Sequence, residues 1–280
     1  MRVLVTGAAG QLGGAIVERF ATTATVVPLT RADLDVTSEA DVLRRAKAER
    51  PDAIINCAAY NAVDQAEDEA STALAVNSIA VLALARAARA CRAMLVHYGS
   101  DFVFDGRADR PYVETDTPCP ESVYALSKLL GEWLAADAPR HYVLRVESLF
   151  GGARAKSSVD RILDALAAGE PARVFVDRTV TPSFVADVAD ATARLLERRP
   201  AEGVYHCVNS GATTWLGIAE EATRLLGCRS NLVPVSVHDV KLKARRPQYC
   251  ALSNEKLRHA GIDMPAWQDA LARYIVSRRS

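Results

Sequence analysis

Short apolar runs alternate with longer amphipathic stretches along the first half of the chain. The apolar, β-branched runs predict strands at residues 2–6, 25–29, 52–56, 94–98 and 141–146. The stretches between them predict helices at residues 11–21, 38–50 and 66–90, and a further helix around Tyr124. Strands that alternate with helices are typical of a parallel sheet covered on both faces.

The pattern changes after Phe150. Helices are predicted at residues 158–168, 187–198 and 215–226, strands at 173–176 and 203–208, and loops with prolines and basic residues from 233 onward. We interpret this half as a mixture, in which one part completes the sheet and the rest forms a small lobe over the cleft. The predicted fold is α/β: a Rossmann-type doubly wound parallel sheet with a small mixed α/β C-terminal substrate lobe.

The composition of the chain argues against some classes of binding partner. The 280 residues are 50% apolar and carry a formal net charge of +0, so no general attraction to nucleic acid or an anionic membrane is expected. No run of 18 apolar residues occurs, and the chain begins directly with a strand and a turn, which predicts a cytoplasmic protein without a signal peptide. The six cysteines are widely and irregularly spaced, which predicts free thiols and no metal site.

A glycine-rich turn follows the first predicted strand. In VTGAAGQLG, Gly7, Gly10 and Gly13 precede the helix that begins at Gln11 and Leu12. Glycines allow a tight turn and a close approach of the backbone to a diphosphate, and the helix directs its first amides at that charge. Residues 1–150 with about 174–208 are therefore predicted to form a dinucleotide-binding domain, and about 151–173 with 209–280 a substrate-binding lobe.

The end of the second predicted strand bears on the choice of cofactor. An NAD site usually places an acid there to bind the ribose 2′-hydroxyl, but this chain has Pro-Leu-Thr followed by Arg31. Arg31 could pair with the 2′-phosphate of NADP, or it could be an ordinary solvated surface arginine. The sequence favours NADP(H), with NAD(H) as an alternative.

Tyr124 and Lys128, in ESVYALSK, are one helical turn apart and share a face. A free phenol has a pKa of about 10, and a nearby ammonium stabilises the phenolate and is expected to lower that value. Such a tyrosine can give a proton to a carbonyl oxygen as hydride reaches the carbon. Ser100, directly after the fourth predicted strand, is the candidate to hold the same oxygen. The order of glycine turn, serine strand and Tyr-x-x-x-Lys makes a chance match improbable.

Together these motifs resemble the extended short-chain dehydrogenase/reductases. The segments RPDAIINCAAYNAVDQAEDE, YGSDFVFDG, VYALSKLLGE and ARRPQYCALSNEKL further resemble the dTDP-4-dehydrorhamnose reductases, over nearly the whole chain. The resemblance implies cofactor contacts by Asp35 and Val36 at the adenine and by Ala58, Ala59 and Tyr60 along the cofactor. It implies catalytic roles for Ser100, Tyr124 and Lys128, substrate contacts for Asp101, Phe102, Ser148 and Arg246, and a supporting role at the catalytic strand for Asn77.

Two positions depart from the family's pattern. Such reductases usually carry a tyrosine where Phe102 stands, and a tryptophan where Ser148 stands, three residues after the arginine that matches Arg145. Because that tryptophan helps to enclose the substrate, its absence affects the sugar or nucleotide that is accepted more than the type of reaction.

The resemblance implies reduction of the C4 ketone of a nucleoside-diphosphate 4-keto-6-deoxy sugar by NAD(P)H. Tyr124 would protonate the oxygen, Lys128 would adjust Tyr124 and hold the nicotinamide ribose, and Ser100 would orient the carbonyl, so that Tyr124 and Lys128 also belong to the cofactor site. A related epimerase is an alternative, whereas a dehydratase would need an acid where Phe102 stands. A non-catalytic NADP-binding regulatory subunit is the third alternative. A monomer or a homodimer is expected.

Overall fold

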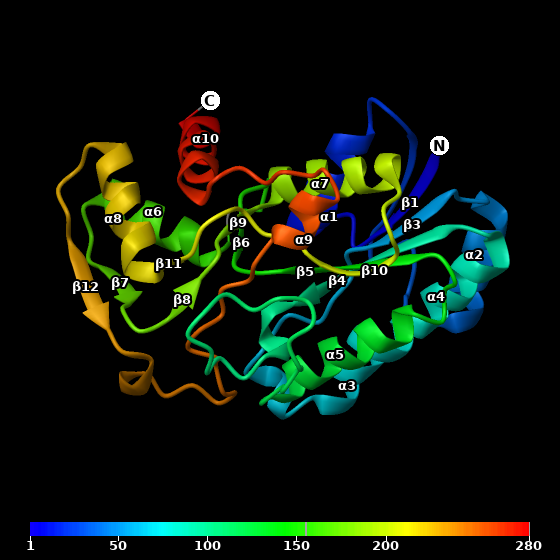
Figure 1. Ribbon diagram of the computed structural model, residues 1–280, viewed down its shortest axis with the longest axis horizontal. Coiled ribbons are helices and arrows are strands. Elements are labelled where there is room, and N and C mark those ends of the chain that lie inside the picture. Colours follow the sequence, from blue (N-terminus) through cyan, green and yellow to red (C-terminus); the bar gives the residue numbers. More distant parts are fainter. Residues whose placement is uncertain (155, 280) are drawn as a thin grey trace.

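Six parallel strands form the centre of the molecule in the computed structural model, which describes residues 1–154 and 156–279 (Figure 1). The strands are β1 (Arg2–Thr6), β2 (Thr25–Leu29), β3 (Ala53–Asn56), β4 (Met94–Ser100), β5 (His141–Val146) and β10 (Gly203–His206). Their order in the sheet is β10-β5-β4-β3-β1-β2, and every neighbouring pair is parallel. The predicted doubly wound parallel sheet is confirmed.

Helices cover both faces of this sheet. One face carries α1 (Gln11–Phe20) and α7 (Val185–Arg198), and the other carries α2 (Glu39–Glu49), α4 (Ala80–Cys91) and α5 (Val123–Ala135) (Figure 1). Successive side chains of a strand point to opposite faces, so Val5 packs in the first core and Leu4 in the second. Burial on both sides explains why these strands read as continuous apolar runs rather than alternating ones.

The predicted helix at residues 66–90 is interrupted. It is built from a 3₁₀ turn η1 (Gln65–Glu67), α3 (Ala70–Leu74), a π-helical turn η2 (Ala75–Ile79) and then α4. Within the described residues, Ala70–Cys91 is the one stretch whose length and apolar composition would suffice to cross a membrane, and half of its most apolar window is buried inside the fold. A core helix of this kind meets the same criterion.

The lobe has a core of its own, beside the carboxyl-end side of the sheet (Figure 1). Its helices are α6 (Ser158–Ala168), α8 (Trp215–Leu226) and α10 (Trp267–Arg279), and the short α9 (Glu255–His259) packs beside β10. Three two-stranded sheets pair β6 (Leu149–Phe150) with β9 (Ser183–Phe184), β7 (Ala172–Phe175) with β12 (Leu232–Val235), and β8 (Thr179–Val180) with β11 (Thr213–Thr214). Trp215 and Trp267 are both buried in this core.

Two predictions about the second half need correction. The predicted division placed residues 174–208 with the six-stranded sheet. However, β7 pairs with β12 outside that sheet, and Val174 of β7 packs into the core of the lobe. The predicted loops after residue 233 omitted α10, which buries Leu271 and Tyr274 in the same core. α7 and β10 do join the sheet as expected. The exact division into two domains stays a prediction.

Candidate active site

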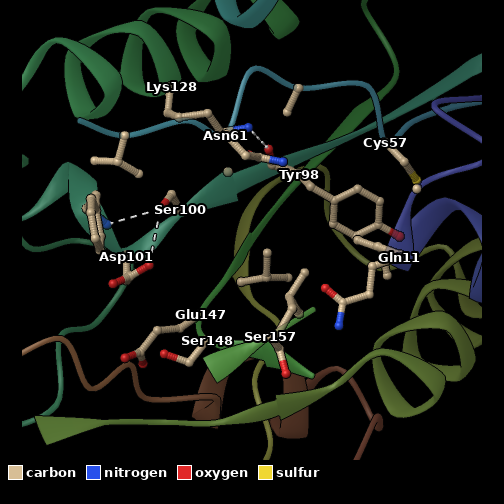
Figure 2. Close-up of a pocket in the computed structure, with 18 of the residues that line it drawn as sticks. Gln11, Cys57, Asn61, Tyr98, Ser100, Asp101, Lys128, Glu147, Ser148 and Ser157 are labelled. Atoms are coloured by element: carbon tan, nitrogen blue, oxygen red, sulfur yellow. Dashed lines mark hydrogen bonds between the residues drawn. The ribbon is translucent and has the colours of Figure 1, made fainter. Parts of the chain in front are cut away.

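A pocket of about 430 Å³ lies between the carboxyl ends of the central strands and the lobe (Figure 2). Doubly wound sheets bind ligands at this edge, where the strand order reverses, here between β1 and β3. Of the predicted site residues, those that line the pocket are Gly10, Gln11, Leu12, Gly13, Ala58, Ala59, Ser100, Asp101, Phe102, Tyr124, Lys128 and Ser148. Gly7, Arg31, Asp35, Val36, Tyr60 and Arg246 do not line it.

The glycine turn has a backbone that larger residues would disrupt. Gly7 has φ +64°, in the left-handed region, and a Cβ there would lie 2.7 Å from the backbone of Cys57 and Ala58. A Cβ on Gly13 would lie 2.2 Å from the carbonyl oxygen of Gly7. The first turn of α1 therefore packs directly on the loop, and its free amides face the pocket. This concave backbone fits a cofactor diphosphate.

Gly13→Ala is expected to weaken NADPH binding at least tenfold and to lower the free energy of unfolding by about 1–3 kcal/mol, because the new methyl group must displace backbone. Fluorescence titration with NADPH and thermal unfolding measure the two effects. Gly14→Ala is the matched control, since a Cβ there meets its nearest atom at 3.8 Å. Equal NADPH affinity in both variants would contradict this role of Gly13.

Arg31 lies beside the glycine turn without entering the pocket. The amide of Ala8 donates to the carbonyl of Leu29 at 3.1 Å, which holds the end of β2 against the turn. Arg31 follows two residues later and is exposed. Asp35 is also exposed, and hydrogen bonds from the hydroxyl and the amide of Thr37 lower the pKa of its carboxyl. The adenine contacts of Asp35 and Val36 stay predictions.

Asn77 holds the loop that follows β3. Its amide oxygen accepts from the Tyr60 amide at 2.8 Å, and its nitrogen donates to the Tyr60 carbonyl at 3.0 Å and to the Ser127 hydroxyl at 3.0 Å. The family resemblance implies that Asn77 supports the catalytic strand. In the structure its hydrogen bonds instead join the loop with Ala58, Ala59 and Tyr60 to helix α5, which carries Tyr124.

Helix α5 brings the predicted catalytic residues to the pocket. It begins after Ser122, whose hydroxyl accepts from the Ala125 amide at 3.2 Å. Tyr124 and Lys128 then occupy one face, one turn apart, and both line the pocket with only 9% and 4% of their surface exposed. Ser100 reaches the pocket from the last position of β4 and accepts from the Phe102 amide at 3.2 Å (Figure 2).

Lys128 is fixed in position by its surroundings. Its ammonium donates to the Tyr98 carbonyl at 2.6 Å, and burial lowers its pKa to about 8, with Glu132 opposing the shift. Glu132 itself forms a buried ion pair with Arg145 of β5 at 2.8 Å. A Cβ on Gly99 would lie 2.3 Å from the Glu132 carboxylate, so α5 and β4 approach closely only because this position is glycine.

The expected lowering of the Tyr124 pKa by Lys128 is wrong. Burial raises the pKa of Tyr124 to about 12, the charge of Asp101 adds to the rise, and a hydrogen bond with Ser100 and the charge of Arg246 oppose it. The phenol therefore keeps its proton at neutral pH, as a proton donor must. The Lys128 ammonium is engaged with the Tyr98 carbonyl instead.

Of the remaining predicted substrate residues, Phe102 and Ser148 line the pocket, and Arg246 lies beside Phe102 outside it. The Phe102 ring packs edge-on against Tyr124, with centroids 5.7 Å apart. Arg246 lies 5.9 Å from the Phe102 ring and pairs with Asp64 at 3.1 Å, whereas the neighbouring Arg245 extends outward to Glu121. The contacts of Phe102, Ser148 and Arg246 with substrate stay predictions.

Sequence reasoning missed two ionisable residues that line this end. The guanidinium of Arg178, from the lobe, lies 5.9 Å from the Phe102 ring, and Glu147 directly follows β5. An arginine in a loop gives no signal that separates a buried pocket residue from a surface one. The sequence did carry a signal for Glu147, which stands next to Ser148 and directly after a buried strand. An acid in such a place is rarely buried unless it has a partner.

The parallel doubly wound sheet, the glycine turn and the convergence of serine, tyrosine and lysine define a protein of the short-chain dehydrogenase/reductase class. Residues 1–279 match the model described as RmlD substrate binding domain, and the chain belongs to this family. The dTDP-4-dehydrorhamnose reductase of Burkholderia thailandensis is 34% identical and the match covers 97% of each chain.

Solved structures agree with this assignment. A dTDP-4-dehydrorhamnose reductase from Clostridium acetobutylicum superposes with a TM-score of 0.95 at 31% identity and covers 100% of both chains. The dTDP-4-dehydrorhamnose reductase of Bacillus anthracis, in complex with NADP, gives a TM-score of 0.94 at 30% identity over 99% of both chains.

Proposed function

We propose that this protein reduces the C4 ketone of a nucleoside-diphosphate 4-keto-6-deoxy sugar with NADPH, as a dTDP-4-dehydrorhamnose reductase does in dTDP-L-rhamnose biosynthesis. The observation that carries the proposal is the meeting of Ser100, Tyr124 and Lys128 in one pocket with the glycine turn. The similarity to curated reductases over nearly the full chain supports the substrate class.

The pocket residues have different roles in the proposed reduction, which follow from their positions. NADPH supplies the hydride when it is bound, and the glycine turn with the first amides of α1 fits its diphosphate. Ser100 and Tyr124 hold the ketone oxygen with two hydroxyl groups. Tyr124, with a pKa of about 12, gives its proton to that oxygen as it becomes an alkoxide, which is a stronger base than the phenolate that remains.

Lys128 contributes its charge to the same pocket. It lies one turn along α5 from Tyr124, and its buried ammonium, held on the Tyr98 carbonyl, keeps a positive charge in a site of low dielectric where negative charge develops during the reduction. Since it also lines the pocket, it can hold a cofactor ribose hydroxyl, which is the second role that the family resemblance implies.

The direct test is an absorbance assay. Purified protein with NADPH and dTDP-4-keto-6-deoxy-L-mannose should consume reduced cofactor in proportion to the ketone supplied, and no cofactor should be lost without the sugar nucleotide. Failure with every 4-keto sugar nucleotide would favour a non-catalytic binding role. NAD that stays bound through purification, combined with interconversion of epimers, would favour an epimerase.

Arg31→Ala should raise the KM for NADPH about tenfold and leave the KM for NADH within about twofold. A charge-assisted hydrogen bond to the 2′-phosphate contributes about 1.5–3 kcal/mol when it forms, and exposure of Arg31 reduces that value. Steady-state kinetics with both cofactors measure the effect. Arg19→Ala, on the far side of α1 where Arg19 pairs with Asp190, is a control. An equal change in the KM for both cofactors would show that Arg31 does not recognise the 2′-phosphate.

We also propose that the protein acts in the cytoplasm as a monomer or homodimer, without nucleic-acid or membrane partners. The equal numbers of basic and acidic residues, 34 and 34, support the absence of a general attraction for polyanions.

A further inference from the structure

Glu147 is a buried carboxyl group in the pocket that the reduction itself does not use. It follows the last residue of β5, has only 2% of its surface exposed and lines the pocket (Figure 2). The next residue, Ser148, has φ +44°, in the left-handed region, so the chain turns sharply at this point. Figure 2 shows the carboxyl groups of Glu147 and Asp101 on the same side of the pocket.

The two oxygens of Glu147 have different environments. Oε2 accepts hydrogen bonds from the Thr181 amide at 2.7 Å and from the Thr181 hydroxyl. Oε1 is buried and has no hydrogen-bond partner within the described chain. An unpaired buried oxygen of an ionised carboxylate is costly, whereas a protonated Oε1 is a free donor that a ligand in the pocket can satisfy.

The charges around Glu147 favour the protonated form. The ionisable groups that face it from the neighbouring segments are Asp101, Arg178, Tyr249 and Cys250. Burial raises the pKa of Glu147 well above its usual range, and the charge of Asp101 adds to the rise. Burial raises the pKa of Asp101 only to about 6, because Arg178 and Ser100 oppose the shift. One guanidinium therefore neutralises Asp101, and the proton stays on Glu147.

A metal ion is the competing explanation for this cluster. Asp101, Glu147 and Cys250 offer ligand-type atoms that lie within 4.8 Å of one another. However, Arg178 donates to the Cys250 sulfur at 3.3 Å and already supplies a positive charge at the cluster. A cation beside the sulfur repels a metal ion, and burial holds the thiol in its protonated form by raising its pKa.

The position of the free oxygen relative to the ketone site suggests a role. The Ser100 hydroxyl, which we assign to the ketone oxygen during the reaction, donates in the structure to Asp101 Oδ1 at 3.1 Å, so the carboxyl pair adjoins the site of the reacting carbonyl. In a 4-keto-6-deoxy sugar, one carbon next to the ketone carries a hydroxyl, at C3, and the other carries the methyl group and the ring oxygen. The hydroxyl is the group that a donor beside the ketone can recognise.

We propose that Glu147 is a neutral carboxylic acid that donates a hydrogen bond from Oε1 to the C3 hydroxyl of the sugar and so positions the ketone over Ser100 and Tyr124. This specificity-determining role rests on the proposed function. Glu147 would thus supply a polar contact to the sugar. The next residue, Ser148, stands where the resemblance to the family implies a tryptophan.

Two variants of similar size separate donation from packing. Glu147→Gln keeps an acceptor for Thr181 and presents an amide donor in place of Oε1–H, so kcat/KM should stay within about threefold of wild type. Glu147→Leu removes the donor, and kcat/KM should fall about tenfold, mainly through a higher KM. NADPH affinity, measured by fluorescence titration, should be unchanged in both variants, which shows that the cofactor site is folded.

The substrate provides the decisive comparison. With the 3-deoxy analogue of the 4-keto sugar nucleotide, wild type and Glu147→Leu should have equal kcat/KM within about twofold, because the hydroxyl partner is absent. A tenfold deficit of the leucine variant on both substrates would overturn the proposal, as would a glutamine variant as impaired as the leucine variant.

Infrared difference spectroscopy tests the protonation without turnover. Wild type at pH 7 should show a carbonyl stretch of a protonated carboxylic acid that Glu147→Gln lacks, and absence of this band would overturn the proposal. Failure of the proposed function gives a different result: wild-type protein with the band intact that reduces no 4-keto sugar nucleotide.

Discussion

Tyr124→Phe should lower kcat by about 10³-fold while the KM for the sugar nucleotide changes little. Proton donation by a positioned side chain contributes about 10²–10⁴-fold to a rate, and phenylalanine keeps the packing of the ring against Phe102 but has no proton to give. The hydroxyl holds its proton through neutral pH because burial raises its pKa to about 12, so it is a competent acid wherever the enzyme works. Steady-state NADPH oxidation measures the loss.

Tyr205→Phe is the matched control for this variant. Tyr205 is also buried, and its hydroxyl donates to the Ala201 carbonyl at 2.6 Å on β10, but it does not line the pocket. Its phenylalanine variant should lose about 1 kcal/mol of stability and retain activity. If Tyr124→Phe turned over substrate as fast as Tyr205→Phe, Tyr124 would not be the proton donor.

Lys128→Met should lower kcat/KM by about 10²–10³-fold, since it removes a fixed positive charge from a buried site where negative charge develops. Methionine fills a similar volume, and Lys256→Met, a substitution at an exposed lysine, is the control. Circular dichroism should show that both variants are folded. A Lys128→Met enzyme within fivefold of wild type would exclude the electrostatic role.

The same lysine is expected to set the alkaline limit of the wild-type enzyme. Burial lowers its pKa to about 8, so in the free enzyme the ammonium loses its proton as the pH rises through about 8 rather than through 10.5. Because the charged form is the active one, kcat/KM should be constant below that value and fall above it. Lys128→Met should show no such fall, and a wild-type profile that stays flat to pH 10 would contradict the assignment.

The repeating strands and helices were predictable because each depends on local pattern. The five strands of the first half are apolar on both faces, and only a doubly covered parallel sheet buries such runs. α10 was missed because its basic residues mask the apolar positions Leu271 and Tyr274, which matter only once the core of the lobe exists. The π-helical turn at Asn77 was missed because composition does not encode a one-residue change in register.

Some features of the site could also be predicted from local sequence, whereas others depend on the folded structure. Tyr124 and Lys128 follow from helical spacing, and Ser100 from its place at the end of a strand. The direction of the Tyr124 pKa shift could not be read from spacing, because it is set by burial and by Asp101, which approaches from another element. Arg178 and Glu147 come from segments far apart in the chain, and only the folded lobe places them in one pocket.

Transfer of label from the cofactor tests the central claim most directly. The protein is incubated with NADPH that carries deuterium at both positions of nicotinamide C4 and with dTDP-4-keto-6-deoxy-L-mannose, and the sugar product is examined by NMR and mass spectrometry. The pocket of Ser100, Tyr124 and Lys128 predicts one deuterium per product molecule, bound at sugar C4, and about 10³-fold slower labelling by Tyr124→Phe. A product without deuterium at C4, or labelling that the phenylalanine variant performs at the wild-type rate, would contradict it.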